Sequence, residues 1–166
     1  MKKSNFVMGV VAVILLITGT CAFALVDEEQ KQILRGLEGV HVVVQRLKPE
    51  IELDGLYRST LETDAELTLR MGGIKVLSDE ESIQAPGTPD LSLKVNALKC
   101  SSGYVYNVGL SLEEKVTLIR RNIPISATTL KIWEQLGIAP RLSDIRDTVK
   151  DLLEEFVKAW QAANQK

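Results

Sequence analysis

The segment that decides the fold is YVYNVGLSLEEKVTL, residues 104–118. Apolar side chains share one alternating phase of it: Tyr104, Tyr106, Val108, Leu110, Leu112, Val116 and Leu118. Polar residues fill most of the other phase, a pattern typical of a strand with one buried face. The exceptions are Val105 on the polar phase and Glu114 on the apolar phase. Glu114 indicates either the margin of the sheet or a β-bulge that shifts the register.

The flanking segments predict that this strand is the middle of an antiparallel meander. Residues 91–97 also alternate between apolar and polar, and Ser101-Ser102-Gly103 is typical of a hairpin turn. Arg120-Arg121-Asn122 predicts a second turn, after which residues 125–133 form a less regular strand candidate. We expect Pro124 to end pairing at that turn, because proline lacks a backbone donor.

Residues 143–164 predict a long closing helix. Ser143 is a good N-cap, and Asp144 lies in the first turn, where a carboxylate suits the helix dipole. The apolar residues at spacings of three and four are Ile145, Val149, Leu152, Leu153, Phe156, Val157, Trp160 and Ala163. Such a stripe predicts that the helix lies along the sheet and closes the core.

The first half of the chain predicts a βαβ unit. Residues 40–47 are mostly apolar and β-branched, which indicates an interior strand covered on both faces. Residues 57–71 carry a helical stripe, Gly72-Gly73 ends it, and residues 74–77 form a short strand. Two strands joined in this way are expected to be parallel. The fold class is therefore α+β, a two-layer fold with a mixed sheet of about five strands covered by two main helices.

Shorter elements are also expected. Ser78 and Glu81 have capping-box spacing, which predicts one or two helical turns. Residues 50–55 are expected to form a charged loop. Residues 27–35 predict a short helix that ends near Gly36.

The N-terminal 24 residues have the layout of a secretory signal peptide. Lys2 and Lys3 precede the apolar run 6–17, and Ala22-Phe23-Ala24 offers the small residues of a cleavage site. We expect cleavage after Ala24, and export to the periplasm or the extracellular space.

Two alternatives remain for this segment. Residues 6–26 carry no charge and have about the length that spans a bilayer, so an uncleaved membrane anchor is one of them. Lipidation at Cys21 is the other, although Thr18 and Thr20 stand where lipoprotein signals place Leu-like and small residues.

Composition favours one exported domain, residues 25–166. Cleavage leaves 142 residues, enough for one core, and takes the formal net charge from −2 to −4. An acidic chain without a basic cluster excludes nucleic acid as the main partner. Only Cys100 remains, so no internal disulfide forms, although a bond between chains is an open alternative to a simple apolar role.

No catalytic, metal-binding or cofactor-binding constellation is present in the sequence. His41, the only histidine, lies in an apolar strand with no ligand spacing around it, and a structural role is expected. A nucleophilic pair of Cys100 with His41 is a minor alternative. The paired acids are expected on solvated faces: Asp64/Glu66, Glu80/Glu81, Glu113/Glu114 and Glu154/Glu155. No glycine-rich phosphate loop follows a strand, and Arg120 with Arg121 alone does not make an anion-binding patch.

Three aromatic residues leave a choice between core and surface. Tyr104, Tyr106 and Trp133 either form a binding surface on the antiparallel strands or lie in the core under the last helix. The apolar phase that the tyrosines share favours the core.

The order of elements also carries a resemblance. Thr63–Arg70 with Gly73–Leu77, and the ending Ile145–Leu152 with Glu155-Phe156, resemble recurring segments of a family of uncharacterised exported bacterial proteins. In topology the domain is similar to periplasmic domains of the curli-secretion lipoprotein, of the lipoprotein activators of penicillin-binding proteins, and of the Tol propeller protein at its N-terminus. This resemblance implies an assembly or interaction module, by analogy of fold alone.

We therefore expect a non-enzymatic binding or assembly module that uses a sheet face or edge to meet a protein of the cell envelope. Membrane contact is expected only if the N-terminal segment is uncleaved or lipidated. The alternative is a small exported hydrolase with an unrecognised site. A pocket joining His41 or Glu114 to another titratable group would favour the hydrolase. An apolar patch or open edge strand would favour the module.

Overall fold

The computed structural model describes residues 32–164, and the side chains of Ile132 and Trp133 lie outside that description. The fold is α+β, with a five-stranded mixed sheet in the order β2-β1-β3-β4-β5. The strands are β1 (Gly39–Val44), β2 (Lys75–Val76), β3 (Asp90–Cys100), β4 (Gly103–Leu118) and β5 (Ile123–Ala139). The helices are α3 (Pro49–Leu53), α4 (Arg58–Met71), α5 (Asp79–Gln84) and α6 (Leu142–Asn164). The signal segment and Cys21 lie outside the described residues.

The predicted βαβ unit is confirmed. β1 pairs in parallel with β2 on one side and with β3 on the other, so β1 is an interior strand. The expectation that both of its faces are covered is wrong. Val40, Val42 and Val44 are buried, whereas His41 and Val43 on the other face are only half-buried. The physical reason is that, among the described elements, only the six-residue helix α5 reaches this second face, near His41.

The predicted meander is also confirmed, with a longer last strand. β4 pairs antiparallel with β3 and with β5, and β5 begins and ends beyond the predicted residues 125–133. Two register shifts, between Leu110 and Ser111 and between Leu112 and Glu113, break the alternation of β5. Pro124 does not end the pairing, because it lies in a strand at the edge of the sheet, where a missing donor is tolerated.

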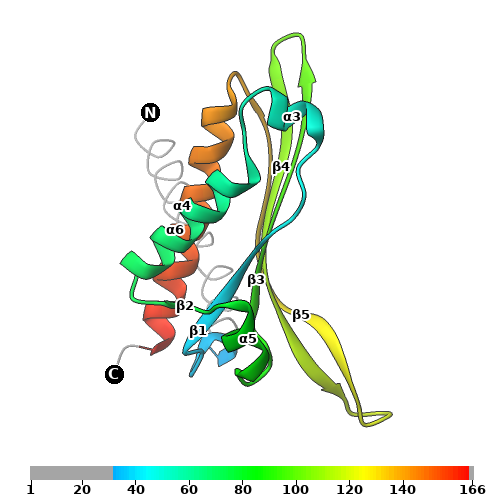
Figure 1. Cartoon of the computed structure of the whole chain (residues 1–166), viewed down its shortest axis with the longest axis vertical. Helices are drawn as coiled ribbons and strands as arrows, with labels where there is room; N and C mark the ends of the chain where they lie inside the picture. The colour runs from blue at the N-terminus through cyan, green and yellow to red at the C-terminus, as the bar shows by residue number, and fades with distance from the viewer. Residues whose placement is uncertain (1–31, 165–166) are drawn as a thin grey trace, which may run out of the picture.

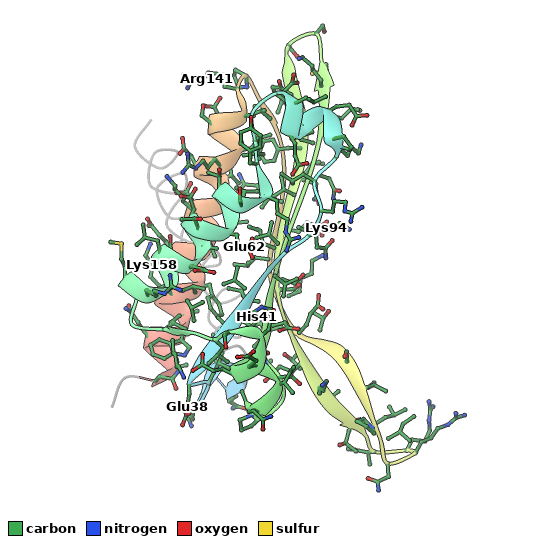
Figure 2. The ribbon with its side chains drawn as sticks, viewed as in Figure 1. Glu38, His41, Glu62, Lys94, Arg141 and Lys158 are labelled. Atoms are coloured by element: carbon green, nitrogen blue, oxygen red, sulfur yellow. The ribbon has the colours of Figure 1, made fainter. Side chains whose placement is uncertain are left out.

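Helices α4 and α6 cover one face of the sheet (Figure 1). The predicted stripe of α6 is buried from Ile145 to Val157, with Phe156 fully enclosed. Glu62 and Lys158 project from the helix layer, whereas Lys94 projects from the opposite face of the sheet (Figure 2). Residues 32–164 therefore form two layers, in which α4 and α6 leave the second sheet face bare. No helix within residues 32–164 has the length and apolar character needed to cross a bilayer.

Two local expectations need comment. The charged loop expected at residues 50–55 is wrong, because Pro49–Leu53 forms α3. Proline at the first helical position, acids in the first turn and the burial of Ile51 all favour this short helix. Of the helix expected at 27–35, only the end is described; residues 32–34 are helical, and Gly36 follows with φ +79°.

The β4–β5 hairpin extends past the rest of the sheet (Figure 1). The last pair between β3 and β4 joins Asp90 to Glu113. Beyond it, β4 and β5 pair only with each other, from Glu114 opposite Ala127 to Leu118 opposite Ile123. We call residues 114–127 the arm.

Candidate functional site

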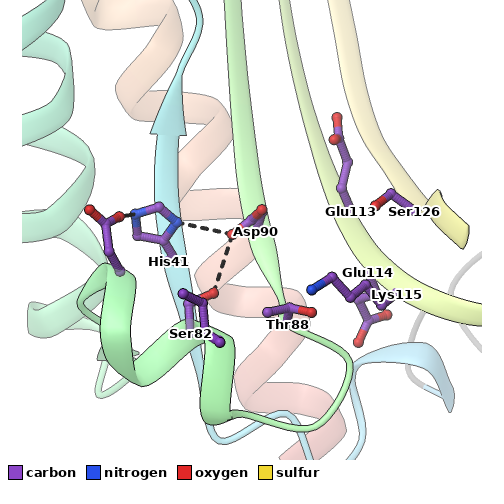
Figure 3. A pocket seen from close by; sticks show the side chains of 10 residues that line it. His41, Ser82, Thr88, Asp90, Glu113, Glu114, Lys115 and Ser126 are labelled. Carbon is purple, nitrogen blue, oxygen red and sulfur yellow. Dashed lines mark hydrogen bonds and ion pairs between the residues drawn. The ribbon is translucent and has the colours of Figure 1, made fainter. Parts of the chain in front are cut away.

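A cavity of about 340 Å³ opens beside His41, between β1, α5, the start of β3 and the base of the arm (Figure 3). The β1–β3 register places His41 opposite Asp90, and the capping box at Ser78 starts α5 so that Asp79 faces the same ring. Glu114, which the sequence singled out, also lines this cavity. The fold thus brings His41 and Glu114 to one place.

The His41 ring is held between two carboxylates. Its Nδ1 lies 3.0 Å from Asp90 Oδ1, and its Nε2 lies 2.9 Å from Asp79 Oδ1. Each ring nitrogen is therefore already engaged. The contact joins α5 to the sheet.

Ser82 completes the group but not a catalytic triad. Its side chain is buried at 4% exposure, and its hydroxyl donates to Asp90 Oδ1 over 3.4 Å. The resulting chain runs Ser82, Asp90, His41, Asp79, with a carboxylate between the hydroxyl and the imidazole. In a nucleophilic triad the imidazole stands next to the hydroxyl, so that it can accept the hydroxyl proton. This order does not provide that step.

Glu114 has a structural partner at the base of the arm. Its carboxylate accepts a hydrogen bond of 2.7 Å from the hydroxyl of Thr129, the residue that the second register shift leaves without a partner on β4. Both sequence interpretations of Glu114 are therefore correct in part: it lies at the sheet margin and beside a bulge. The bulge itself is in β5. The backbone N–H of Lys115 donates to Gly87 O at 2.6 Å and fixes the base of the arm to the loop before β3.

Cys100 lies far from His41. It ends β3 at the hairpin turn, whereas His41 is paired with the first residue of β3. The thiol is exposed, and hydrogen bonding to Ser102 lowers the pKa of Cys100. The Cys100–His41 pair considered from the sequence is therefore not formed.

The other singled-out residues have structural partners or lie apart. Asp64 binds Arg146, Glu66 binds Arg70, and Glu81 serves in the capping box of α5. Arg120 and Arg121 lie in the turn at the end of the arm. No group of three or more His, Cys, Asp or Glu side chains within residues 32–164 is arranged to hold a metal ion.

The core interpretation of the two tyrosines is confirmed. Tyr104 and Tyr106 are 9% and 8% exposed. The Tyr106 hydroxyl shares a hydrogen bond with Thr148 of α6, and the Tyr104 hydroxyl donates to Asp54. The hydrogen bond of the Tyr104 hydroxyl to the Asp54 carboxylate raises the pKa of Tyr104, and Asp54 also binds Lys99. The side chain of Trp133 is outside the described part.

A second candidate site lies on the bare face of the sheet. Leu98, Val105 and Ile138 stand side by side on β3, β4 and β5, with exposures of 62%, 40% and 68%. Leu136, 75% exposed, lies two residues earlier on β5. We call these four residues the apolar row. Val105, the exception on the polar phase, is part of it.

The apolar row borders an open edge of the sheet. β5 is the last strand, and no described segment pairs with its outer side. The two register shifts and Pro124 disrupt this edge towards the arm. Residues 134–139 form its regular part, which carries Leu136 and Ile138.

Comparisons with protein-family models, with curated proteins and with solved structures give no match to this chain. The resemblance drawn from the sequence therefore stays a prediction. The function is therefore inferred from the geometry of the His41 cavity and of the apolar row.

Proposed function

We propose that this chain is an extracytoplasmic, non-enzymatic binding or assembly module of the bacterial cell envelope. The observation that carries the proposal is the apolar row beside the regular end of the β5 edge. Isolated exposed apolar residues are common, but four neighbours on one face are typical of an interaction surface. We propose that a protein of the envelope covers this row.

The edge indicates how such a partner binds. A peptide segment added to β5 at residues 134–139 would form main-chain hydrogen bonds with the open edge. Its side chains on the bare face would then contact Leu136 and Ile138, which are 75% and 68% exposed. The irregular stretch of β5 near Thr129 does not favour such pairing, because bulges interrupt the ladder.

The hydrolase alternative rests on the His41 cavity. That cavity is concave and contains titratable groups, which is the usual setting of an active site. Against the hydrolase stands the order of the side chains, since Ser82 donates to Asp90 and both His41 nitrogens face carboxylates. The arrangement supports a role in positioning α5.

The proposal is tested by affinity capture from envelope extract with three proteins: the wild type, the double variant Leu136→Glu/Ile138→Glu, and Leu53→Glu. Leu53 lies on α3 with 86% exposure, so its variant places one such carboxylate at an exposed apolar site outside the row. We expect one partner to be retained by the wild type and by Leu53→Glu and to be lost with the double variant. Equal capture by all three proteins, with equal urea midpoints, would contradict a role for the apolar row.

A further inference from the structure

The arm carries an apolar face that no helix of residues 32–164 covers. The phase that is buried from Tyr104 to Leu112 continues into the arm as Val116 and Leu118. The register places Val116 opposite Ile125 and Leu118 opposite Ile123, so these four side chains share one face of the hairpin. In Figure 1 the arm diverges from α4 and α6, and the helix layer does not extend over it.

The end of the arm is its most exposed apolar point. Ile119 lies in the turn with 94% exposure, and Ile123 and Ile125 are 44% and 37% exposed. The opposite face carries Thr117 and Pro124. The hairpin is therefore amphipathic and has an isoleucine at its end.

The charge of the arm differs in sign from that of the whole chain. Lys115, Arg120 and Arg121 are basic, and no acidic residue occurs from Lys115 through Lys131. The chain as a whole has a net charge of −2. None of these three side chains forms an ion pair with a residue in the described part. A binding partner that complements the arm is therefore apolar where it meets the isoleucines and anionic where it meets the basic side chains.

We infer that the arm is a membrane-contact element whose end, Ile119, enters the headgroup region of a bilayer of anionic phospholipids. Basic side chains next to an exposed apolar end match the layers of such a surface, with phosphates outside and acyl chains beneath. The entry is shallow, because the outer edges of a two-stranded arm keep unpaired backbone groups that need water or headgroups. The apolar row lies at the other end of the sheet, so this site is distinct from the proposed protein surface.

The test uses the full chain with an environment-sensitive fluorophore on the arm. Thr117→Cys receives the label on the polar face, in a background of Cys21→Ser and Cys100→Ser. The N-terminal segment is the same in every variant, so any vesicle binding by it is shared by all of them, whereas the label reports only where the arm lies. Vesicles contain either phosphatidylcholine alone or equal amounts of phosphatidylglycerol and phosphatidylcholine.

We expect a several-fold rise in emission, with a blue shift and quenching by headgroup-labelled lipid, on the anionic vesicles only. Arg120→Gln/Arg121→Gln should abolish the preference for anionic vesicles, and Ile119→Ser/Ile123→Ser should abolish the quenching. High salt should weaken the signal, because the attraction is between exposed charges. The matched control Leu136→Ser removes an exposed apolar side chain from the apolar row and should leave the signal unchanged.

Several outcomes would overturn the inference. One is an arm label that does not respond on anionic vesicles while the far-ultraviolet circular dichroism is native. Another is an equal response in the arginine or isoleucine variants. A label that responds only when envelope protein is added would instead assign the arm to a protein partner. A label moved to Glu154→Cys on the exposed face of α6 must stay silent, since a response there would indicate general adsorption.

Discussion

Single residues set how closely the layers of this fold approach each other. Gly72 ends α4 against α6, and a β-carbon there would overlap the Val157 side chain. Gly137 lies on β5 below the ring of Tyr106, and a β-carbon there would be 2.7 Å from the hydroxyl and 2.8 Å from Cζ. Because Thr148 holds that hydroxyl, the ring cannot move aside without breaking a buried hydrogen bond. Neither position therefore has room for a side chain.

Gly137→Ala should therefore lower the free energy of unfolding by about 1–3 kcal/mol, the usual range for overpacking a core. Urea unfolding measures the change. Leu136→Ala, the neighbouring residue on the exposed face, should cost about 0.5 kcal/mol or less. Equal midpoints for the two variants would show that Tyr106 does not pack over β5 as described.

The pair of Asp64 and Arg146 joins the two main helices. Arg146 donates two hydrogen bonds to the Asp64 carboxylate, whose side chain is only 12% exposed. Hydrogen bonding to the guanidinium lowers the pKa of Asp64 below its ordinary value of 3.8. The ionised carboxylate is therefore favoured in the folded state.

This shift makes the pair sensitive to acid. Its stabilisation is complete above the ordinary pKa and is lost as the pH falls through the lowered folded value. Asp64→Asn should lower the free energy of unfolding by about 1–3 kcal/mol at neutral pH. The difference in this free energy between the variant and the wild type should become smaller below about pH 4. Urea titrations at neutral pH and at low pH test this, with the exposed Glu154→Gln as control. A difference that is constant with pH would contradict the ion pair.

Among the elements, α6 covers β4 and β5, whereas α4 covers β1 and β2. The buried face of α6 runs from Ile145 to Ala163, while Glu154 lies on the solvent side. Trp160 adds a hydrogen bond from its indole N–H to Leu37 O and so fixes the segment before β1. The helix therefore holds both the meander and the N-terminal part of the described chain.

Phe156→Ala should lower the free energy of unfolding by about 3–5 kcal/mol, because the ring is 0% exposed and its removal leaves a cavity in the core. Glu154→Ala, two residues away on the polar face, should cost little. Urea midpoints of the wild type and both variants provide the measurement. Three equal midpoints would mean that the stripe of α6 does not face the sheet.

α5 depends on a different kind of contact. It has six residues, and His41 bonds to Asp79 in its first turn. His41→Ala should leave any activity and the global midpoint nearly unchanged, but should speed amide hydrogen exchange within residues 79–84. Amides of β4, in the core, serve as the internal control. Loss of an enzymatic activity in folded His41→Ala would support the hydrolase instead.

At the scale of the whole molecule, one layer of helices covers one face of the sheet within the described residues. The apolar row and the arm lie at opposite ends of the sheet, so the proposed protein contact and the proposed membrane contact do not compete for the same surface. Both proposals require the chain to leave the cytoplasm, which depends on the N-terminal segment.

We predict that the exported chain begins at Leu25. The reason is the Ala22-Phe23-Ala24 site after a short apolar run. Intact mass of the protein recovered from the envelope fraction measures this directly. A start at a lipidated Cys21, or at Met1, would contradict cleavage after Ala24.

Local periodicity was enough to predict α4, β4 and α6, because each repeats its apolar residues over several turns or strand positions. It did not predict the full length of β5, where the bulges near Thr129 and Ile132 shift the phase. The site was less accessible to prediction. Asp90 meets His41 only because β1 pairs with β3, a strand that begins 49 residues after His41. Local sequence patterns do not specify such a distant register.

The central position of β1 also has a consequence for how the sheet assembles. β1 is the first strand of the described residues, yet it lies between β2 and β3, which both come after it in the chain, and β3 pairs with it as far as Leu93. The short turns at 101–102 and 119–122 join β3 to β4 and β4 to β5, so these strands can form antiparallel pairs locally and quickly. In a chain that emerges N-terminus first, the four valines of β1 therefore stay unpaired until β2 and β3 have emerged. We expect the parallel pairing to be the slow step of folding, and this unpaired strand to be where a chaperone binds during export.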